Sequence, residues 1–466
     1  MIGILAQNED LLEASGSTWT DQVNTSIIHP LALVIFLIAA FWLFFGPRGK
    51  IVWSVLLIAC FISVAQRFAV MTMDFNFIRA IGTLGLIRIL AYGELRTLKP
   101  NVTDKLLCAF VVILVLLTVV REGPSSGVSK AGYSLDLFSM YWVGRSSLRT
   151  AKDLRMMMAA LGVMAIPLSV FFIIERSTGR NLFSIFGGVP PLTFERDGKL
   201  RAQGSFCHPI IAGVFFACFF PLAVGVIRSK VRGVATLLGG WVLVGFSIMI
   251  MLMSNSSTPI AGVLIGLMAW ATFRYRRNLK TWAYIALLLM VICHFGSTHG
   301  VHHVLFTRVD FTGSSTGYHR YALIDGLIDN VQRWVLIGDA NPGYNKSYRD
   351  ITNMYVVSAL SGGGIALGLL LSLVYQAFKS TLRGVRNAGS REEIMMMYGL
   401  GCSYATMAVS FTAVACYGEG VVPWYMLLGG GLTVSQTLMA KKSVHMKAKK
   451  SAQQPSPHQH RQAHAT

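Results

Sequence analysis

Long apolar stretches, separated by short polar ones, fill most of the 466-residue chain. About 20 consecutive apolar residues suffice for a helix to cross the hydrocarbon core of a bilayer. The pattern therefore predicts an all-α, polytopic helical membrane protein with about 12–13 transmembrane helices. The predicted spans are 28–45, 51–70, 77–93, 105–120, 131–147, 156–174, 206–226, 233–253, 259–273, 281–296, 353–378, 394–414 and 421–439.

Basic residues mark one set of connections between these spans. If the acidic N-terminal segment lies outside, every inner connection and the C-terminal tail carry an excess of Lys and Arg. Cytoplasmic loops are enriched in these residues, so the pattern predicts an outer N-terminus and a cytoplasmic C-terminus. Span 131–147 contains Asp136 and could also be re-entrant or interfacial. A full crossing is favoured, because without it the basic cluster from Arg145 to Arg155 falls on the outer side.

Composition supports the membrane assignment, since 53% of the residues are hydrophobic and only 13% are charged. Soluble domains carry about 25% charged residues. The net charge of +20 would suggest nucleic-acid binding in a soluble protein. Here it is mainly an orientation signal, with some attraction to anionic membrane lipid. No nucleic-acid partner is expected.

The polar segments divide the chain into three regions. Residues 1–27 are predicted to be an outer N-terminal segment, residues 28–439 the transmembrane bundle, and residues 440–466 a disordered basic tail. Two outer loops, 175–205 and 297–352, are long. Because a chain that is mostly membrane has few places for polar chemistry, these loops are the first candidates for a functional site.

Three arginines, Arg67, Arg79 and Arg88, lie within predicted spans. A charge at bilayer depth costs about 2.5–3.5 kcal/mol on insertion scales and often marks a site. Arg67 and Arg79 lie near the outer ends of their spans, where they could also snorkel, and Asp74 could pair with either. Arg79 is a candidate binding residue, with snorkelling or a structural ion pair as the favoured alternatives.

A basic cluster of Arg196, Lys199 and Arg201 ends the first long outer loop, and Gly204 and His208 follow. The planar fork of an arginine binds phosphate oxygens in a bidentate manner and stays charged. A glycine lets the backbone approach a ligand closely. The cluster suits a pyrophosphate group at the membrane surface, and binding of lipid headgroups is the alternative.

The second long outer loop contains His319, Arg320 and Asp325. Apolar residues at helical spacing follow Arg320 and predict an amphipathic helix. Arg320 near its start would add to the anion-attracting backbone amides of a helix N-terminus. The alternative is that these charges form the solvated face of a surface helix. The apolar positions are Tyr321, Leu323, Ile324, Leu327, Ile328, Val331 and Trp334.

Five features follow one another from residue 201 to residue 364. They are an Arg-x-x-Gly before a span (Arg201, Gly204), a helix headed by Arg320, a turn segment with Gly338 and Gly343, an Asn-x-Tyr at the start of a span (Asn353, Tyr355), and the glycines 362–364. In this order and spacing the chain resembles the O-antigen ligase and polymerase superfamily of bacterial envelope glycosyltransferases. The strongest match covers roughly residues 195–370, and the other spans fit the family's usual count of about a dozen.

The resemblance implies a GT-C-like bundle in the bacterial inner membrane, with loops 175–205 and 297–352 in the periplasm. It also implies a glycosyl transfer from an undecaprenyl-pyrophosphate-linked glycan to a sugar hydroxyl, without metal or cofactor. Arg201 and Arg320 would then bind the pyrophosphate and stabilise the charge that develops on it. Other polysaccharide assembly proteins are candidate partners. Candidate substrate-binding residues are Arg196, Lys199, Gly204, His208, Asn353, Tyr355 and Arg79.

One position departs from the family pattern. Many ligases of this type carry a histidine just before the Asn-x-Tyr, where this chain has Thr352. A threonine hydroxyl is not a general base near neutral pH, so the base would be His319, Asp325 or Asp350. This departure favours a member that polymerises oligosaccharide repeat units of an exopolysaccharide or O-antigen.

Two other functions remain open. A ligase would use the same donor but transfer the glycan to lipid A-core or another acceptor. A transporter or flippase would show paired repeats and polar or broken helices near mid-bilayer. The sequence shows no convincing repeat, although the run Gly362–Gly364 could break a helix.

Overall fold

The fold is built from helices that follow the predicted spans in order. The computed structural model describes residues 26–70, 73–196, 198–296, 316–344, 348 and 351–453. The helices are α2 (Pro30–Phe45), α3 (Ile51–Phe61), α4 (Phe77–Ala91), α5 (Val102–Glu122), α6 (Pro124–Ser147), α7 (Ala151–Thr178), α8 (Pro209–Arg228), α9 (Val234–Thr236), α10 (Leu243–Met253), α11 (Ser257–Ala271), α12 (Leu279–Gly296), α14 (Thr316–Asp329), α15 (Val331–Trp334), α16 (Met354–Asn387), α17 (Arg391–Ser410) and α18 (Val421–Gln453).

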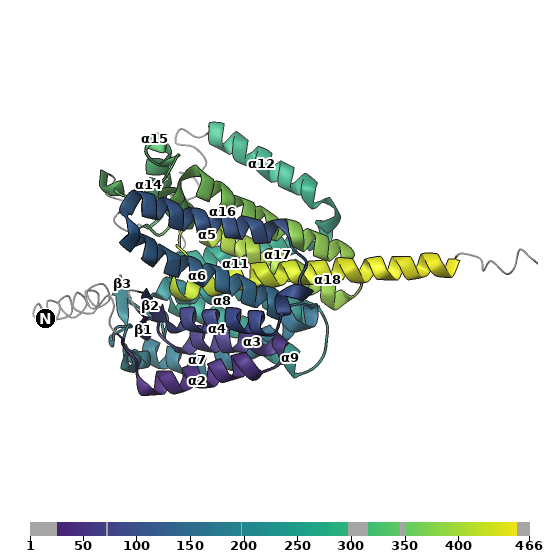
Figure 1. Cartoon of the computed structure of the whole chain (residues 1–466), viewed down its shortest axis with the longest axis horizontal. Coiled ribbons are helices and arrows are strands. Elements are labelled where there is room, and N and C mark those ends of the chain that lie inside the picture. Colours follow the sequence, from purple (N-terminus) through teal and green to yellow (C-terminus); the bar gives the residue numbers. More distant parts are fainter. Residues whose placement is uncertain are drawn as a thin grey trace, which may run out of the picture.

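Two short antiparallel hairpins and several single turns complete the described elements. The hairpins pair β1 (Arg67–Val70) with β2 (Met73–Asn76), and β3 (Phe194–Arg196) with β4 (Lys199–Arg201). The short turns are η1 (Arg48–Lys50), η2 (Glu94–Thr97), η3 (Leu182–Phe186), η4 (Leu237–Val242, a π-helix), η5 (Thr272–Asn278), η6 (Pro342–Tyr344) and η8 (Gly418–Gly420). Both hairpins lie at one end of the helical bundle, which we call the hairpin end (Figure 1).

The described residues contain five helices that are long and apolar enough to cross a membrane. They are α5, α7, the continuous segment Val234–Met253, α8 and α16. The other predicted spans also lie wholly or mostly in helices. The chain is therefore an all-α, multi-pass membrane protein, as predicted. The predicted span 51–70 is wrong in its second half, because the helix ends at Phe61 and the chain forms β1 after a turn at Ser63.

The helix α6 settles how the fifth predicted span is built. It is continuous over 24 residues, which corresponds to about 36 Å at the rise of an α-helix. Its Asp136 accepts two hydrogen bonds from Arg79 of α4, at 2.9 and 2.8 Å. Each charge thus has a partner within the bundle, so the helix carries Asp136 without exposing a lone carboxylate.

Basic connections gather at the end of the bundle opposite the hairpins. In Figure 1, α18 leaves the bundle at that end and continues well beyond it. The predicted disordered tail 440–466 is thus helical as far as Gln453, because Ala, Lys, Met and Gln are good helix formers. Side-chain contacts join the connections at this end: Arg149 to Thr97, Arg155 to Glu392, Arg391 to the Arg228 carbonyl oxygen, and Lys441 to Glu393.

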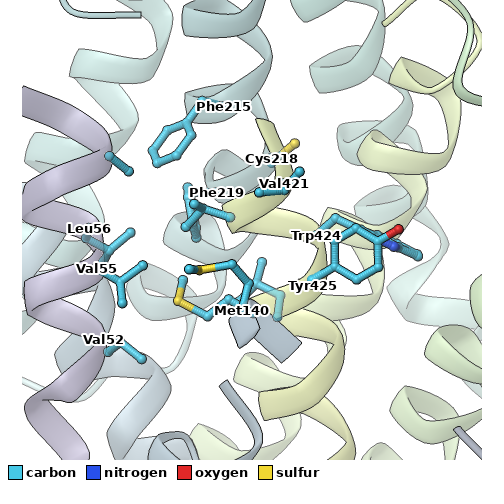
Figure 2. Close-up of a cluster of buried hydrophobic side chains, with 14 of the residues drawn as sticks. Val52, Val55, Leu56, Met140, Phe215, Cys218, Phe219, Val421, Trp424 and Tyr425 are labelled. Atoms are coloured by element: carbon cyan, nitrogen blue, oxygen red, sulfur yellow. The ribbon is translucent and has the colours of Figure 1, made fainter. Parts of the chain in front are cut away.

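Large apolar side chains fill the centre of the bundle. Figure 2 shows Val55 and Leu56 of α3, Phe219 of α8, and Trp424 and Tyr425 of α18 meeting there. All five are at most 1% exposed. In a water-soluble protein, burying a large apolar side chain stabilises the fold by about 1.5–3 kcal/mol relative to leaving it exposed to water. In a membrane, close packing and polar contacts between helices supply more of the association energy.

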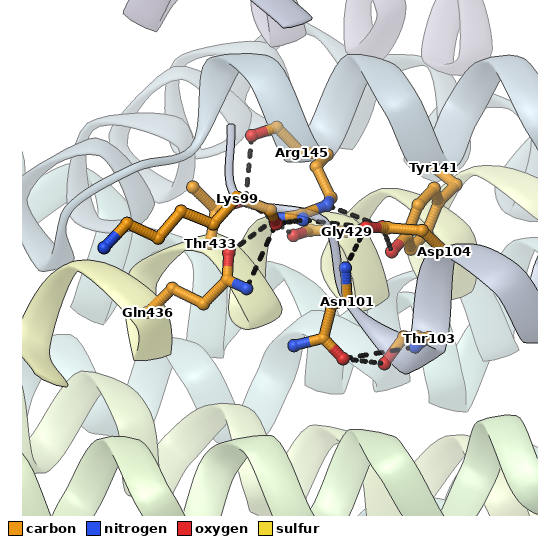
Figure 3. A network of polar contacts seen from close by, with 9 residues as sticks. All are labelled: Lys99, Asn101, Thr103, Asp104, Tyr141, Arg145, Gly429, Thr433 and Gln436. Carbon is orange, nitrogen blue, oxygen red and sulfur yellow. Dashed lines mark hydrogen bonds and ion pairs between the residues drawn. The ribbon is translucent and has the colours of Figure 1, made fainter. Parts of the chain in front are cut away.

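Arg145 is the centre of a polar network within the described bundle (Figure 3). Its side chain has no exposure and donates to both carboxylate oxygens of Asp104, at 2.8 and 3.0 Å. It also donates to Thr433 Oγ1 and Gln436 Oε1, both at 3.0 Å, and to the Lys99 carbonyl oxygen. The network joins α5, α6 and α18. Arg145 therefore stabilises the packing of these helices, in addition to belonging to a basic cluster that indicates the orientation of the chain.

Candidate functional site

A cavity of about 420 Å³ opens at the hairpin end, between the β3–β4 hairpin, the start of α8, the helix α14 and the segments that precede α16 and α18. This volume is in the usual range for small-molecule sites. Three arginines and two histidines contribute to its wall, from both of the long loops singled out in the sequence. The lining residues are Phe194, Arg196, Arg201, His208, Ile210, Ile211, His319, Arg320, Ile351, Thr352, Ala413, Val414, Ala415 and Tyr417.

Arg201 is the most buried of the cationic side chains in the cavity wall, with 3% exposure. It ends strand β4, and its Nε donates to the Ser254 carbonyl oxygen at 3.1 Å. Its guanidinium group lies 5.7 Å from the ring centre of Phe194, the paired residue on β3. The hairpin therefore fixes the arginine from two sides while its charge faces the cavity.

A buried carboxylate orders the segment that follows Arg201. Glu175, near the end of α7, accepts hydrogen bonds from the backbone amides of Gln203 at 3.0 Å and Gly204 at 2.8 Å. Gly204 has φ +61°, and a Cβ there would lie 2.6 Å from the ring of Phe172. The glycine is thus required by the turn and by close packing. It does not line the cavity.

His208 lines the cavity and also caps α8. Its Nδ1 accepts from the Ile210 amide at 3.1 Å, so a neutral ring carries its proton on Nε2. Burial, and then the positive charge of Arg201, lower the pKa of His208 from 6.5 to about 4. The ring is therefore neutral at physiological pH, and Nε2 is a hydrogen-bond donor.

The helix α14 also lines the cavity, through His319 and Arg320, which lie one turn from its start. The Arg320 guanidinium donates to Thr258 Oγ1 of α11 at 2.7 Å. The predicted amphipathic helix is present, but it ends at Asp329, with α15 following it. Of the predicted apolar positions, Leu323, Leu327 and Trp334 are buried, while Ile328 and Val331 are exposed.

These buried residues belong to a small core of their own. Leu323, Leu327 and Trp334 pack with Tyr348 and with the first two turns of α16. Trp334 Nε1 donates to the Leu327 carbonyl oxygen at 2.7 Å, and the Tyr348 hydroxyl donates to that of Leu323 at 3.2 Å. We call this unit, α14, α15, Tyr348 and residues 354–361, the cap. It holds Arg320 on a rigid element.

The start of α16 connects the cavity to the bundle. Thr352 lines the cavity, but Asn353 is fully buried and caps the helix by accepting from the amides of Tyr355 and Val356. Its side-chain amide donates to the Thr412 carbonyl oxygen, and the Tyr355 hydroxyl donates to that of Ala408. The Asn-x-Tyr motif therefore joins α16 to the end of α17 and does not line the cavity.

The helix α16 is interrupted at Gly362 and Gly363. Gly363 has φ +66° and ψ −167°, a region that is almost exclusive to glycine. The amide of Gly364 donates to the Val335 carbonyl oxygen, and the carbonyl oxygen of Leu360 accepts from Asp339 and Arg121. The segment that follows α15 therefore packs at this break. The backbone groups of Leu360 and Gly364 form their hydrogen bonds with it and with Arg121.

Three further predicted site residues, Lys199, Asp325 and Arg79, are not in the cavity wall. Lys199 is exposed on β4, and Asp325 interacts with the Tyr321 side chain. Arg79 forms its bidentate pair with Asp136. Asp350 lies outside the described residues.

The cavity wall favours a negatively charged ligand. Within the described parts of the chain, Arg196, Arg201 and Arg320 line it, and no Asp or Glu does. The neutral His208 adds a donor, and Ile210, Ile211 and Val414 are apolar members of the lining. Three cations together with apolar side chains suit an anionic group attached to a less polar one, such as a phosphate or pyrophosphate on a lipid or sugar.

Two buried carboxyl groups next to the cavity are not among the predicted site residues. Glu175 is an acid near the end of a predicted span, which is itself a signal. Glu419 follows the cavity-lining Tyr417 and lies between two apolar spans.

Comparison with known proteins adds no assignment, because no protein-family model and no curated protein matches the chain.

Proposed function

We propose that this protein polymerises undecaprenyl-pyrophosphate-linked oligosaccharide repeat units, for an exopolysaccharide or O-antigen, at the periplasmic face of the bacterial inner membrane. The observation that carries the proposal is that Arg201 and Arg320, from two distant loops, line one cavity. The resemblance to the O-antigen ligase and polymerase superfamily supplies the ligand and the reaction. The N-terminus and the hairpin end would lie in the periplasm, since the basic connections gather at the other end.

In this mechanism the arginines bind the pyrophosphate of the donor. The bond between the anomeric carbon and the pyrophosphate oxygen breaks, and a bond to the acceptor hydroxyl oxygen forms. Arg201, Arg320 and Arg196 stabilise the negative charge that develops on the leaving group, as preorganised cations do in a partly dry site. His208 donates from Nε2 to a substrate oxygen.

His319 is the proposed base. It lines the same cavity as Arg320, whereas Thr352, at the position of the ligase histidine, carries only a hydroxyl group. The acceptor proton would pass to His319 as the new glycosidic bond forms. A general base within hydrogen-bond reach contributes typically 10²–10⁴-fold to the rate.

The deciding experiment is turnover of a purified lipid-linked repeat unit by the detergent-solubilised protein, with the product sized on a gel. Wild type is expected to give a ladder of polymer, and Arg201→Ala and Arg320→Ala each to abolish it. Lys199→Ala is the matched control, because this cation belongs to the same loop but not to the cavity wall. Near-normal polymer from both arginine variants would overturn the proposal.

A deletion strain separates the polymerase from the two alternatives. Loss of a polymerase leaves products with a single repeat, whereas loss of a ligase leaves polymer on the carrier lipid. Loss of a flippase leaves the repeat unit on the cytoplasmic face. Only the first outcome agrees with the proposal.

A further inference from the structure

A carboxyl group without a charge partner lies behind the wall of the cavity. Glu419, in the turn η8, has no exposure, and the polar groups nearest its oxygens are backbone amides and the thiol of Cys207. It follows Tyr417 and the residues 413–415, all of which line the cavity. Buried ionisable residues are costly and in membrane proteins usually serve a function.

The surroundings of Glu419 lead directly to the cavity. The turn η8 packs against Cys207, just before α8, and against Val64, which follows α3. A Cβ on Gly418 would lie 3.7 Å from the Sγ of Cys207 and 3.2 Å from Val64. Cys207 precedes His208, which lines the cavity. The titratable groups that interact electrostatically with Glu419 are the thiols of Cys60 and Cys207.

Nothing in the described surroundings neutralises the carboxylate. None of the ion pairs among the described residues includes Glu419. Burial raises the pKa of Glu419 from 4.5 to about 7, against weaker opposing contributions from nearby backbone groups and the Cys207 thiol. The side chain therefore changes charge close to neutral pH.

We propose that Glu419 is a proton-binding site coupled to the cavity, which takes up a proton when an anionic ligand enters and releases it when the ligand leaves. The physical basis is repulsion between like charges, which favours the neutral acid. At an effective dielectric constant of about 20, one negative charge about 10 Å away raises proton affinity roughly tenfold. The proton comes from solvent, and no covalent bond other than O–H changes. Only the identity of the anion rests on the proposed function.

The proton site is tested first, without ligand. Difference infrared spectroscopy follows protonation of carboxyl groups in the full-length, detergent-solubilised protein as pH changes. Wild type and the control Glu195→Gln, which removes an exposed acid on β3, are expected to show a carboxyl group titrating near pH 7. Glu419→Gln is expected to lose the contribution of one carboxyl group, while the other buried acid beside the cavity, Glu175, keeps its own contribution. An unchanged titration in Glu419→Gln would overturn the proposal.

A second variant protects the test against misfolding of Glu419→Gln. Cys207→Ser replaces a thiol beside the carboxylate with a hydroxyl, which is a stronger donor. The titration midpoint is expected to move to lower pH, because hydrogen bonding favours the charged form. An unchanged midpoint would contradict the assignment of the signal to Glu419.

Coupling is tested by adding farnesyl diphosphate, a short prenyl diphosphate. The midpoint is expected to move to higher pH, which corresponds to a roughly tenfold rise in proton affinity, and Arg201→Ala is expected to abolish this shift. A diphosphate that binds without moving the midpoint would overturn the coupling. A diphosphate that does not bind would overturn the coupling and the proposed ligand together, while the titration without ligand still decides the proton site.

Discussion

Arg201 and Arg320 donate hydrogen bonds to the same turn, although they come from different loops. Arg201 Nε donates to the Ser254 carbonyl oxygen at 3.1 Å, and Arg320 donates to Thr258 Oγ1 at 2.7 Å. Ser254 ends α10, and Thr258 lies in the first turn of α11. The turn between these helices therefore sets how the two guanidinium groups lie in the cavity.

Replacing Thr258 with valine should loosen Arg320 while keeping the shape of the side chain. Hydrogen bonds to charged groups contribute about 1.5–3 kcal/mol, so binding of a diphosphate should weaken roughly tenfold or more. Binding of farnesyl diphosphate, measured by calorimetry, checks this. Thr437→Val is the control, since Thr437 bonds only within α18 and should leave affinity unchanged. Equal affinity in both variants would contradict the role of Thr258.

Lysine at position 201 or 320 should restore little of the function lost with alanine. A lysine keeps the charge but lacks the planar fork that makes two parallel hydrogen bonds to phosphate oxygens. Lysine also cannot keep the geometry of the Arg201 bond to Ser254. Polymer yield of Arg201→Lys and Arg320→Lys should remain below about a tenth of wild type, which corresponds to at least 1.4 kcal/mol. Yields close to wild type would show that charge alone suffices.

The titration of His208 should make the fold less stable in acid. The folded pKa of about 4 lies below the ordinary value of 6.5, so the unfolded chain binds this proton first as pH falls. The contribution of His208 to the free energy of unfolding is therefore fully present above pH 6.5. It decreases as pH falls toward 4, by up to about 3 kcal/mol. His208→Asn keeps a helix cap but cannot titrate. Melting temperatures should show wild type losing stability relative to this variant over that interval, whereas parallel curves would contradict it.

A methyl group at Gly363 should damage the interrupted helix. Alanine disfavours the backbone conformation at this position, and its Cβ would lie 2.7 Å from the Leu336 carbonyl oxygen. A residue held in such a region costs about 1–3 kcal/mol before any clash. Gly368→Ala is the matched control in the same helix, where nothing lies within 4 Å. It should be neutral or stabilising by up to about 1 kcal/mol, so similar melting temperatures for both variants would contradict the role of the break.

The buried pair of Arg145 and Asp104 should be expensive to break. Removing one partner of a buried ion pair costs about 3–5 kcal/mol, because the other charge is left unpaired. Arg145→Ala should therefore greatly lower the melting temperature. Arg155→Ala removes a more exposed pair with Glu392 and should cost about 1 kcal/mol or less. Equal effects would mean that the network in Figure 3 does not stabilise the fold.

Apolar periodicity was sufficient to predict the order of the helices, because each span carries its own signal. It failed where the pairing of two short neighbouring strands, or the lack of a helix-ending residue, decides the structure. Residues 67–70 form a strand because 73–76 lie beside them. The tail continues α18 because nothing in its sequence ends a helix before Gln453.

The candidate site shows the same division. The cations Arg196, Arg201 and Arg320 and the histidines 208 and 319 were selected by residue type and position, and the structure places them around one cavity. Asn353 and Tyr355 were selected by motif, yet their side chains bond to the end of α17. Glu175 could not be assigned from sequence, since its partners are backbone amides about 30 residues away, as the bonds to Gln203 and Gly204 show.

The separate core of the cap has a mechanical consequence. Arg320 is attached to the cap, whereas Arg201 is attached through its hairpin to α7 and α10 of the main bundle. The distance between the two charges therefore depends on how one packed body rests on another. The interrupted turn at Gly362 and Gly363 is where those bodies join within a single helix. The packing of the cap on the bundle therefore tunes the spacing of the two charges only as far as the turn at Ser254 and Thr258, which binds both arginines, allows.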